Sequence, residues 1–145
     1  WCPVCNTQLQ QLQQDYLSQF QQLGAQLIAV TPENPTHVQR TMVKNALKFE
    51  VVTDQGNYIA RRYGILWEVP DDNKQKFDTW LKDTTGRTLM DYNGQKGYAL
   101  PIPATFVIGQ DSTVHFAFVD PEYWNRADPE AIIEVLKELT TSKAP

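Results

Sequence analysis

The two cysteines are the residues of this sequence best suited to covalent chemistry. Cys2 and Cys5 are the only cysteines among 145 residues, and Pro3 and Val4 separate them. This spacing allows both sulfurs to sit on one turn of backbone. Helical periodicity follows, so Cys5 lies at or next to a helix start, where free backbone N–H groups and the helix dipole favour a thiolate. The pair is therefore predicted to be a redox-active dithiol.

Two other uses of a CxxC pair fit the sequence less well. A zinc site needs four nitrogen or sulfur ligands, and the chain adds only His37 and His115, far apart in sequence. A structural staple would close a very small loop and remove little entropy from the unfolded chain. A metal-binding module and a redox-inert interaction module stay open as alternatives from another functional class. We expect no cofactor and no bound metal.

Composition limits the remaining classes of function. The chain has the length of one ordinary domain, 41% of its residues are hydrophobic, and we expect a single domain over residues 1–145. The net charge is −4 without a basic stripe, which argues against a nucleic-acid partner. No apolar run is long enough to span a bilayer, so no membrane partner is expected. Two cysteines without a disulfide framework favour a reducing compartment, and a cytoplasmic location is predicted.

The first half of the chain alternates between helical and strand patterns. Apolar residues three and four apart predict a helix over residues 6–23, and the glutamines between them predict a solvated face. An apolar run at 26–31 predicts a central strand covered on both faces. A helix over 36–47, a strand over 49–53 and a short helix follow. This order is typical of an α/β sheet with short crossovers, and such a motif needs a strand before it, which we expect to precede Trp1.

The second half begins with a weaker signal. Residues 65–100 form a predicted excursion with a helix over 71–82, and we expect it to surround part of the site. Strands over 104–108 and 113–119 make a hairpin in which His115 faces away from the aromatic row, as expected of a sheet-surface residue. A last helix begins at Asp128-Pro129 and buries an apolar face.

The order of these elements resembles the thioredoxin fold over nearly the whole chain. The resemblance implies a three-layer α/β/α sandwich with a central mixed sheet. In that family a proline in cis stands opposite the CxxC and precedes a strand. Pro103, in the segment Ile102-Pro103-Ala104-Thr105-Phe106, matches that proline by position, and Pro101 is the competing candidate.

Three phrases resemble the alkyl hydroperoxide reductase and thiol-specific antioxidant (AhpC/TSA) family, the peroxiredoxin-like proteins. They are Trp-Cys-Pro-x-Cys at residues 1–5, Pro-Ala-Thr-Phe-Val-Ile at 103–108 and Phe-Val-Asp-Pro-Glu-Tyr at 118–123. The resemblance implies an antioxidant thiol oxidoreductase that reduces hydroperoxides. It also implies an external thiol reductant, such as a thioredoxin or glutathione system, and a homodimer as one expected assembly. A thioredoxin-like protein disulfide reductase is the alternative.

The resemblance leaves the order of attack open. In peroxiredoxins the attacking cysteine ends a Thr-x-x-Cys motif, which puts Cys5 at that position and Cys2 at the threonine. In thioredoxins the first cysteine attacks and the second resolves, which reverses the two roles. Trp1 is expected to shield the site and Pro3 to rigidify the turn.

The arginine of the peroxiredoxin site has no counterpart at its usual position, because that position falls on Pro103. Other arginines could supply the cation, although solvation on a helix surface is the simpler interpretation for each of them. These candidates are Arg61, Arg62, Arg87 and Arg126.

Overall fold

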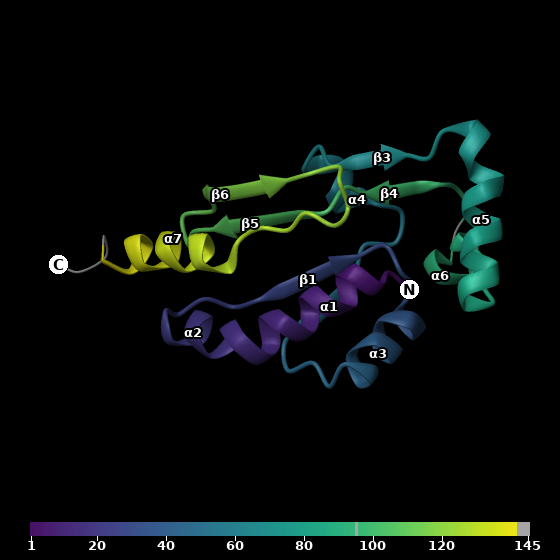
Figure 1. Ribbon diagram of the computed structural model, residues 1–145. Helices are drawn as coiled ribbons and strands as arrows, with labels where there is room; N and C mark the ends of the chain where they lie inside the picture. Colours follow the sequence, from purple (N-terminus) through teal and green to yellow (C-terminus); the bar gives the residue numbers. More distant parts are fainter. Residues whose placement is uncertain (95, 142–145) are drawn as a thin grey trace.

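A long helical run begins at the two cysteines. The computed structural model describes residues 1–94 and 96–141. The run consists of α1 (Pro3–Gln11), a π-helical segment η1 (Leu12–Tyr16) and α2 (Leu17–Gln22), as Figure 1 shows in purple. Pro3 occupies the first turn, where its missing N–H leaves no helical hydrogen bond unmade. The helix predicted over 6–23 is thus confirmed and begins three residues earlier.

In the described part of the chain, the strands pair as three two-stranded sheets. Strand β1 (Ile28–Thr31) runs parallel to β2 (Glu50–Thr53), and α3 (Pro35–Lys44) connects the two strands. The predicted hairpin is confirmed as β5 (Ala104–Ile108) and β6 (Val114–Val119), which pair antiparallel. This mixture of helices and strands is the thioredoxin-like α/β fold that the sequence predicts.

Strand β1 is covered on one face only. Ala29 and the preceding Leu27 pack against the cluster that α2 and α3 share, whereas Ile28 is 51% exposed and Val30 is 47% exposed. The prediction of a strand buried on both faces is therefore wrong. An unbroken apolar run cannot distinguish the two cases, because side chains alternate between faces whatever their type.

Helix α2 joins two hydrophobic clusters. Phe20, which is 3% exposed, packs with residues of β5 and of the final helix α7 (Pro129–Thr141), among them Ile132 and Ile133. One turn earlier, Leu17 packs with a second cluster from α3 and β2. Because both side chains project from one helix, α2 is the element that holds the two halves of the fold together.

The predicted excursion over residues 65–100 is closed by a pair of strands. Strands β3 (Leu66–Glu68) and β4 (Ala99–Pro101) pair antiparallel and close it, after the short helix α4 (Tyr58–Arg62). Helices α5 (Asp71–Thr85) and α6 (Leu89–Asn93) lie between the two strands, which confirms the predicted helix over 71–82. Figure 1 shows α5 and α6 at the end of the molecule that carries the N-terminus.

The polar face of α1 is not simply solvated. Asn45 Nδ2 donates to Asn6 Oδ1 at 2.7 Å, and Gln10 Nε2 donates to Asn45 Oδ1 at 2.9 Å. Farther along, Gln13 Nε2 donates to the Ala46 carbonyl at 2.7 Å. The three helix side chains lie on one face because their spacing is four and three residues. Gln10 is exposed, as the predicted solvated face requires, and these side chains also attach the helix to the loop after α3.

Replacing Asn45 with alanine is expected to lower the free energy of unfolding by about 1–3 kcal/mol, because Asn6 Oδ1 and Gln10 Nε2 lose their partner. Urea denaturation followed by circular dichroism measures the change. Gln11→Ala, at an exposed position of the same helix, is the matched control. Equal stability of the Asn45 and Gln11 variants would contradict the structural role of the contacts.

Candidate active site

The two cysteines form a disulfide at the start of α1. Cys2 is the N-cap residue of the helix, its backbone is extended, and the Cys5 N–H donates to Cys2 Sγ at 3.2 Å. The Cα atoms are 5.3 Å apart. Asn6 adds a second hydrogen bond to Cys2, in which its Nδ2 donates to the Cys2 carbonyl at 2.9 Å. Both cysteines are half-buried, and Pro3 between them is exposed.

A guanidinium group lies against the second sulfur. Arg126 Nη2 donates to Cys5 Sγ at 3.6 Å, from a position 121 residues away along the chain. Arg126 Nη1 donates to the Asn125 carbonyl at 2.8 Å, while the buried Nε has no hydrogen-bond partner. Burial lowers the pKa of the guanidinium from its ordinary value, yet an arginine stays protonated at neutral pH. A cation at this distance stabilises a thiolate on Cys5 after reduction.

Packing of the following residues explains this placement. Ala127 is buried in the cluster that contains Phe20 and Ile133, so the start of α7 is fixed against the helical run that begins at the cysteines. Arg126 precedes this anchor by one residue, at the end of the loop that returns from β6 (Figure 1). The packing of Ala127 therefore positions the neighbouring Arg126 guanidinium beside Cys5 Sγ.

The four candidate arginines differ in their solvent exposure. Solvation on the surface is confirmed for three of them, since Arg61, Arg62 and Arg87 are exposed. It is wrong for Arg126, which is half-buried in a loop. The sequence did carry a signal, because Arg126 stands two residues before the Asp128-Pro129 helix start and so lies outside any helix.

Trp1 lies in an aromatic cluster beside Cys2. Its ring centroid is 5.8 Å from that of Phe77, 6.5 Å from Trp80 and 6.3 Å from Tyr92. These three rings come from α5 and α6. The excursion therefore packs against the residue that adjoins Cys2, as expected of a segment that surrounds the site.

His37 extends this neighbourhood as a buried base. It is 8% exposed, and its ring centroid is 4.6 Å from that of Tyr92. Burial lowers the pKa of His37 below its ordinary value, the positive charges of Arg40 and Arg87 lower it further, and Glu33 opposes the shift. The ring is therefore neutral at pH 7 in the folded protein.

The lowered pKa of His37 predicts a loss of stability in mild acid. Below the unfolded pKa of about 6.5, the unfolded chain binds a proton that the folded chain refuses, so stability falls until the folded pKa is reached. We expect the melting temperature to fall as the pH is lowered from about 7.5 to about 5.5. A His37→Gln variant should show a flatter profile over that range, and identical slopes would contradict the assignment.

Pro103 does not have the isomer that the resemblance implies. The structure contains no cis peptide bond among its described residues, so the Ile102–Pro103 bond is trans and the prediction of a cis proline is wrong. The Ile102 N–H donates to the Ile65 carbonyl at 2.7 Å, and the Pro103 carbonyl accepts from the Asp120 N–H at 3.3 Å. Both contacts hold an extended segment leading into β5, and the trans isomer suits such a segment. Pro101, the competing candidate, is the last residue of β4.

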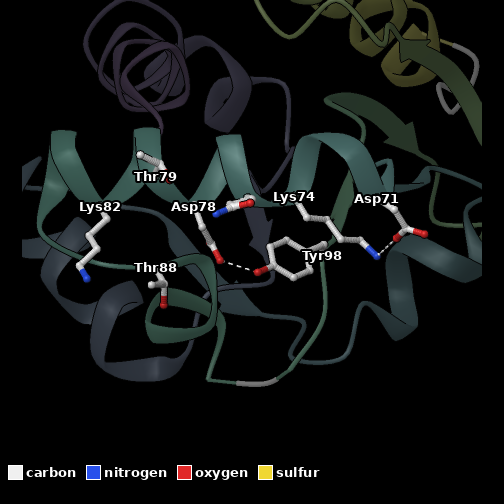
Figure 2. Close-up of a pocket in the computed structure, with 8 residues that line it drawn as sticks. Asp71, Lys74, Asp78, Thr79, Lys82, Thr88 and Tyr98 are labelled. Carbon is white, nitrogen blue, oxygen red and sulfur yellow. Dashed lines mark hydrogen bonds and ion pairs between the residues drawn. The ribbon is translucent and has the colours of Figure 1, made fainter.

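A surface cavity of about 530 Å³ lies along α5, separate from the cysteines (Figure 2). Tyr98 Oη donates to Asp78 Oδ2 across it at 2.5 Å, and this hydrogen bond raises the pKa of Tyr98. Lys74 forms an ion pair with Asp71 at its edge.

Within the described ranges 1–94 and 96–141, no cluster of three or more histidine, cysteine or acidic residues could hold a metal ion. None of the helices in this part of the chain is long and apolar enough to cross a membrane.

Comparison with solved structures supports the fold. A cysteine-to-serine variant of peroxiredoxin 6 of Arenicola marina has a TM-score of 0.65 at 20% identity, over 99% of this chain and 58% of its own. The chain thus spans little more than half of that relative. Xanthomonas campestris peroxiredoxin Q has a TM-score of 0.67 at 16% identity, over 96% of this chain and 72% of its own. The bacterioferritin comigratory protein of the same organism has a TM-score of 0.66 at 15% identity, over 96% and 73%.

Sequence comparison assigns the family. None of the curated proteins compared with the chain matches it. Among known families, the AhpC/TSA family matches residues 1–117, which include both cysteines and the β5 strand. The match covers most of the sequence and agrees with the thioredoxin-like structure. The chain therefore belongs to the AhpC/TSA family.

Proposed function

We propose that the chain is a thiol-dependent peroxidase in which Cys5 attacks the hydroperoxide and Cys2 resolves the intermediate. The single observation that carries the proposal is the contact of 3.6 Å between Arg126 Nη2 and Cys5 Sγ. Membership of the AhpC/TSA family supports it, and so does the alkyl peroxide reduction activity named for the bacterioferritin comigratory protein. An external dithiol is the proposed reductant. The cytoplasmic location and the homodimer stay predictions.

The reaction needs only the two sulfurs and a cation. The Cys5 thiolate attacks one peroxide oxygen, the O–O bond breaks, and the alkoxide leaves and takes up a proton as an alcohol. Cys5 is now a sulfenic acid. The Cys2 thiolate then attacks the Cys5 sulfur, hydroxide leaves as water after protonation, and the Cys2–Cys5 disulfide forms. The Cα atoms of the two cysteines are 5.3 Å apart, a backbone separation that suits disulfide formation.

The contacts of the two sulfurs favour Cys5 as the first attacker. Cys2 Sγ accepts from a neutral backbone N–H, whereas Cys5 Sγ accepts from the positively charged guanidinium of Arg126. A charge-assisted hydrogen bond is roughly twice as strong as a neutral one. The same cation stabilises the negative charge that develops when the peroxide bond breaks.

Single-cysteine variants test the order of attack. Reduced Cys2→Ser protein treated with one equivalent of hydroperoxide should gain the mass of one oxygen atom on Cys5, and a sulfenic-acid trapping reagent should label it. The Cys5→Ser variant is the matched control and should gain nothing at the same rate. Rapid sulfenic acid formation on Cys2, with none on Cys5, would overturn the proposed order.

A thioredoxin-like protein disulfide reductase is the second candidate. It is favoured by the position of Cys2, whose sulfur caps α1 and accepts the Cys5 N–H at 3.2 Å. In this reaction the Cys2 thiolate attacks a substrate disulfide, and Cys5 resolves the mixed disulfide. Incubation of reduced Cys5→Ser protein with an oxidised protein substrate should then accumulate a mixed disulfide on Cys2. Its absence, together with rapid peroxide consumption by the wild type, would exclude this candidate.

A further inference from the structure

Two aromatic side chains shortly before Arg126 in the chain are exposed to solvent. Tyr123 is 55% exposed and Trp124 is 58% exposed, and their ring centroids are 4.9 Å apart at an interplanar angle of 75°. They lie in the loop between β6 and α7, where residues 121–125 are all exposed. Contact between the two rings forms a continuous aromatic surface that the described part of the fold does not cover.

Hydrogen bonds hold this loop in one shape. Asp120 Oδ1 accepts from the Glu122 N–H at 2.9 Å, and Asp120 Oδ2 accepts from Asn125 Nδ2 at 2.8 Å. The Asn125 N–H also donates to the Glu122 carbonyl at 2.8 Å. The aromatic pair is therefore presented by a preorganised loop, which reduces the entropy that a partner must remove on binding.

The loop is joined directly to the redox site. Arg126 follows it, donates through Nη1 to the Asn125 carbonyl at 2.8 Å and contacts Cys5 Sγ through Nη2. Only Asn125 separates Trp124 from Arg126 in the chain, a backbone span of at most about 7 Å. A protein that covers the aromatic pair is thus close enough to bring a thiol to the disulfide.

The surroundings of the pair are acidic. Glu122 lies within the loop, and Asp128 and Glu130 follow at the start of α7, all of them exposed. The nearby cation, Arg126, is directed at the sulfur. Electrostatic complementarity therefore favours a partner with basic residues around its contact surface.

We propose that Tyr123 and Trp124 form the docking surface for the protein dithiol that reduces the Cys2–Cys5 disulfide. The partner is a small redox protein that carries an accessible dithiol within an apolar, basic-rimmed surface. Tyrosine and tryptophan are the side chains that most often anchor protein interfaces. A small thiol or peroxide needs no such anchor. The inference rests on the proposed function, since it concerns the regeneration of the same disulfide.

The exchange balances over two steps. A partner thiolate attacks Cys2 Sγ, the Cys2–Cys5 bond breaks, and Cys5 leaves as the thiolate that Arg126 stabilises. The second partner thiolate then attacks the partner sulfur of the mixed disulfide, and Cys2 leaves and is protonated. The partner ends as a disulfide, and two electrons have passed to the dithiol of this chain.

Two reductants separate docking from chemistry. Peroxide turnover of a Tyr123→Ser, Trp124→Ser double variant is measured with a basic-rimmed thioredoxin, recycled by its reductase and NADPH, and in parallel with dithiothreitol. We expect KM for thioredoxin to rise about tenfold or more, as for loss of interface anchors. The rate constant with dithiothreitol should stay within about twofold of wild type. Tyr58→Ser, at a residue 72% exposed on α4, is the matched control and should change neither value.

Each other outcome overturns the inference. An unchanged KM for thioredoxin would show that the pair does not dock the reductant. A loss with both reductants would show that the loop acts by positioning Arg126, and a rise in KM for the peroxide alone would assign the pair to the peroxide. A change of oligomeric state in the double variant would identify a second copy as the occupant. Wild-type protein that is inactive even with dithiothreitol would instead overturn the proposed function.

Discussion

Arg126→Gln protein is expected to react with hydroperoxide about 10- to 100-fold more slowly than wild type, because a hydrogen bond to a charged group contributes about 1.5–3 kcal/mol. The guanidinium lies 3.6 Å from Cys5 Sγ and is the cation that contacts either sulfur in the described part of the chain. Its removal leaves the Cys5 thiolate without a charged partner, both before attack and as the peroxide bond breaks. The fraction of Cys5 present as thiolate at neutral pH should fall as well.

Stopped-flow measurement of reduced protein with hydroperoxide tests this expectation, and ultraviolet absorbance of the thiolate as a function of pH tests its cause. Arg126→Lys keeps the charge but lacks the planar fork, so its rate should lie between those of the wild type and the glutamine variant. Arg61→Gln, at an exposed position, is the control. Rates for Arg126→Gln equal to those for Arg61→Gln would show that the contact does not activate Cys5.

Phe20→Ala is expected to lower the free energy of unfolding by about 3–5 kcal/mol, since it removes a large buried side chain. Phe20 is 3% exposed and lies between α2, β5 and α7, where it contacts the cluster containing Ala127 and Ile133. The cavity left by Phe20→Ala would weaken the packing at the start of α7, the end of the helix that follows Arg126. Peroxide reactivity of the remaining folded protein should therefore also fall.

Urea denaturation measures the first effect of Phe20→Ala, and the initial rate with hydroperoxide under native conditions measures the second. Phe20→Leu retains most of the volume and should lose less of both. Val43→Ala, at a side chain 70% exposed, is expected to change stability by less than about 0.5 kcal/mol. A Phe20→Ala protein as stable as Val43→Ala would contradict the role of α2 as the joint between the two clusters.

Local patterns were sufficient to predict the part of the site that lies on one element. The spacing of Cys2 and Cys5 and the periodicity that follows placed both residues at a helix start, and the structure makes Cys2 the N-cap. Asp128-Pro129 likewise marked the start of α7. In each case the residues that determine the structure are neighbours in sequence, so their types and spacing carry the information.

Contacts between residues that are far apart along the chain could not be predicted from the sequence. The 120 positions between Cys5 and Arg126 give no sign that the two side chains meet, and the place of Arg126 outside any predicted helix separates it from Arg61 without naming its partner. The face of α1 that carries Gln10 has the same polar periodicity whether it meets water or the loop at Asn45. Strands β3 and β4 are three residues each, too short for alternation to be recognised.

Cys2 gives α1 a cap whose charge depends on oxidation state. The oxygen caps of most helices are the same in every redox state, but this sulfur is neutral in the disulfide and becomes an anion when reduced and deprotonated. The anion accepts the Cys5 N–H more strongly and interacts favourably with the positive end of the helix dipole. Helix α1 therefore stabilises the reduced form in which Cys2 is a thiolate, and linkage raises the reduction potential of the pair by about 30 mV for each 1.4 kcal/mol of this stabilisation. Folding of the helix thus makes the Cys2–Cys5 disulfide easier to reduce.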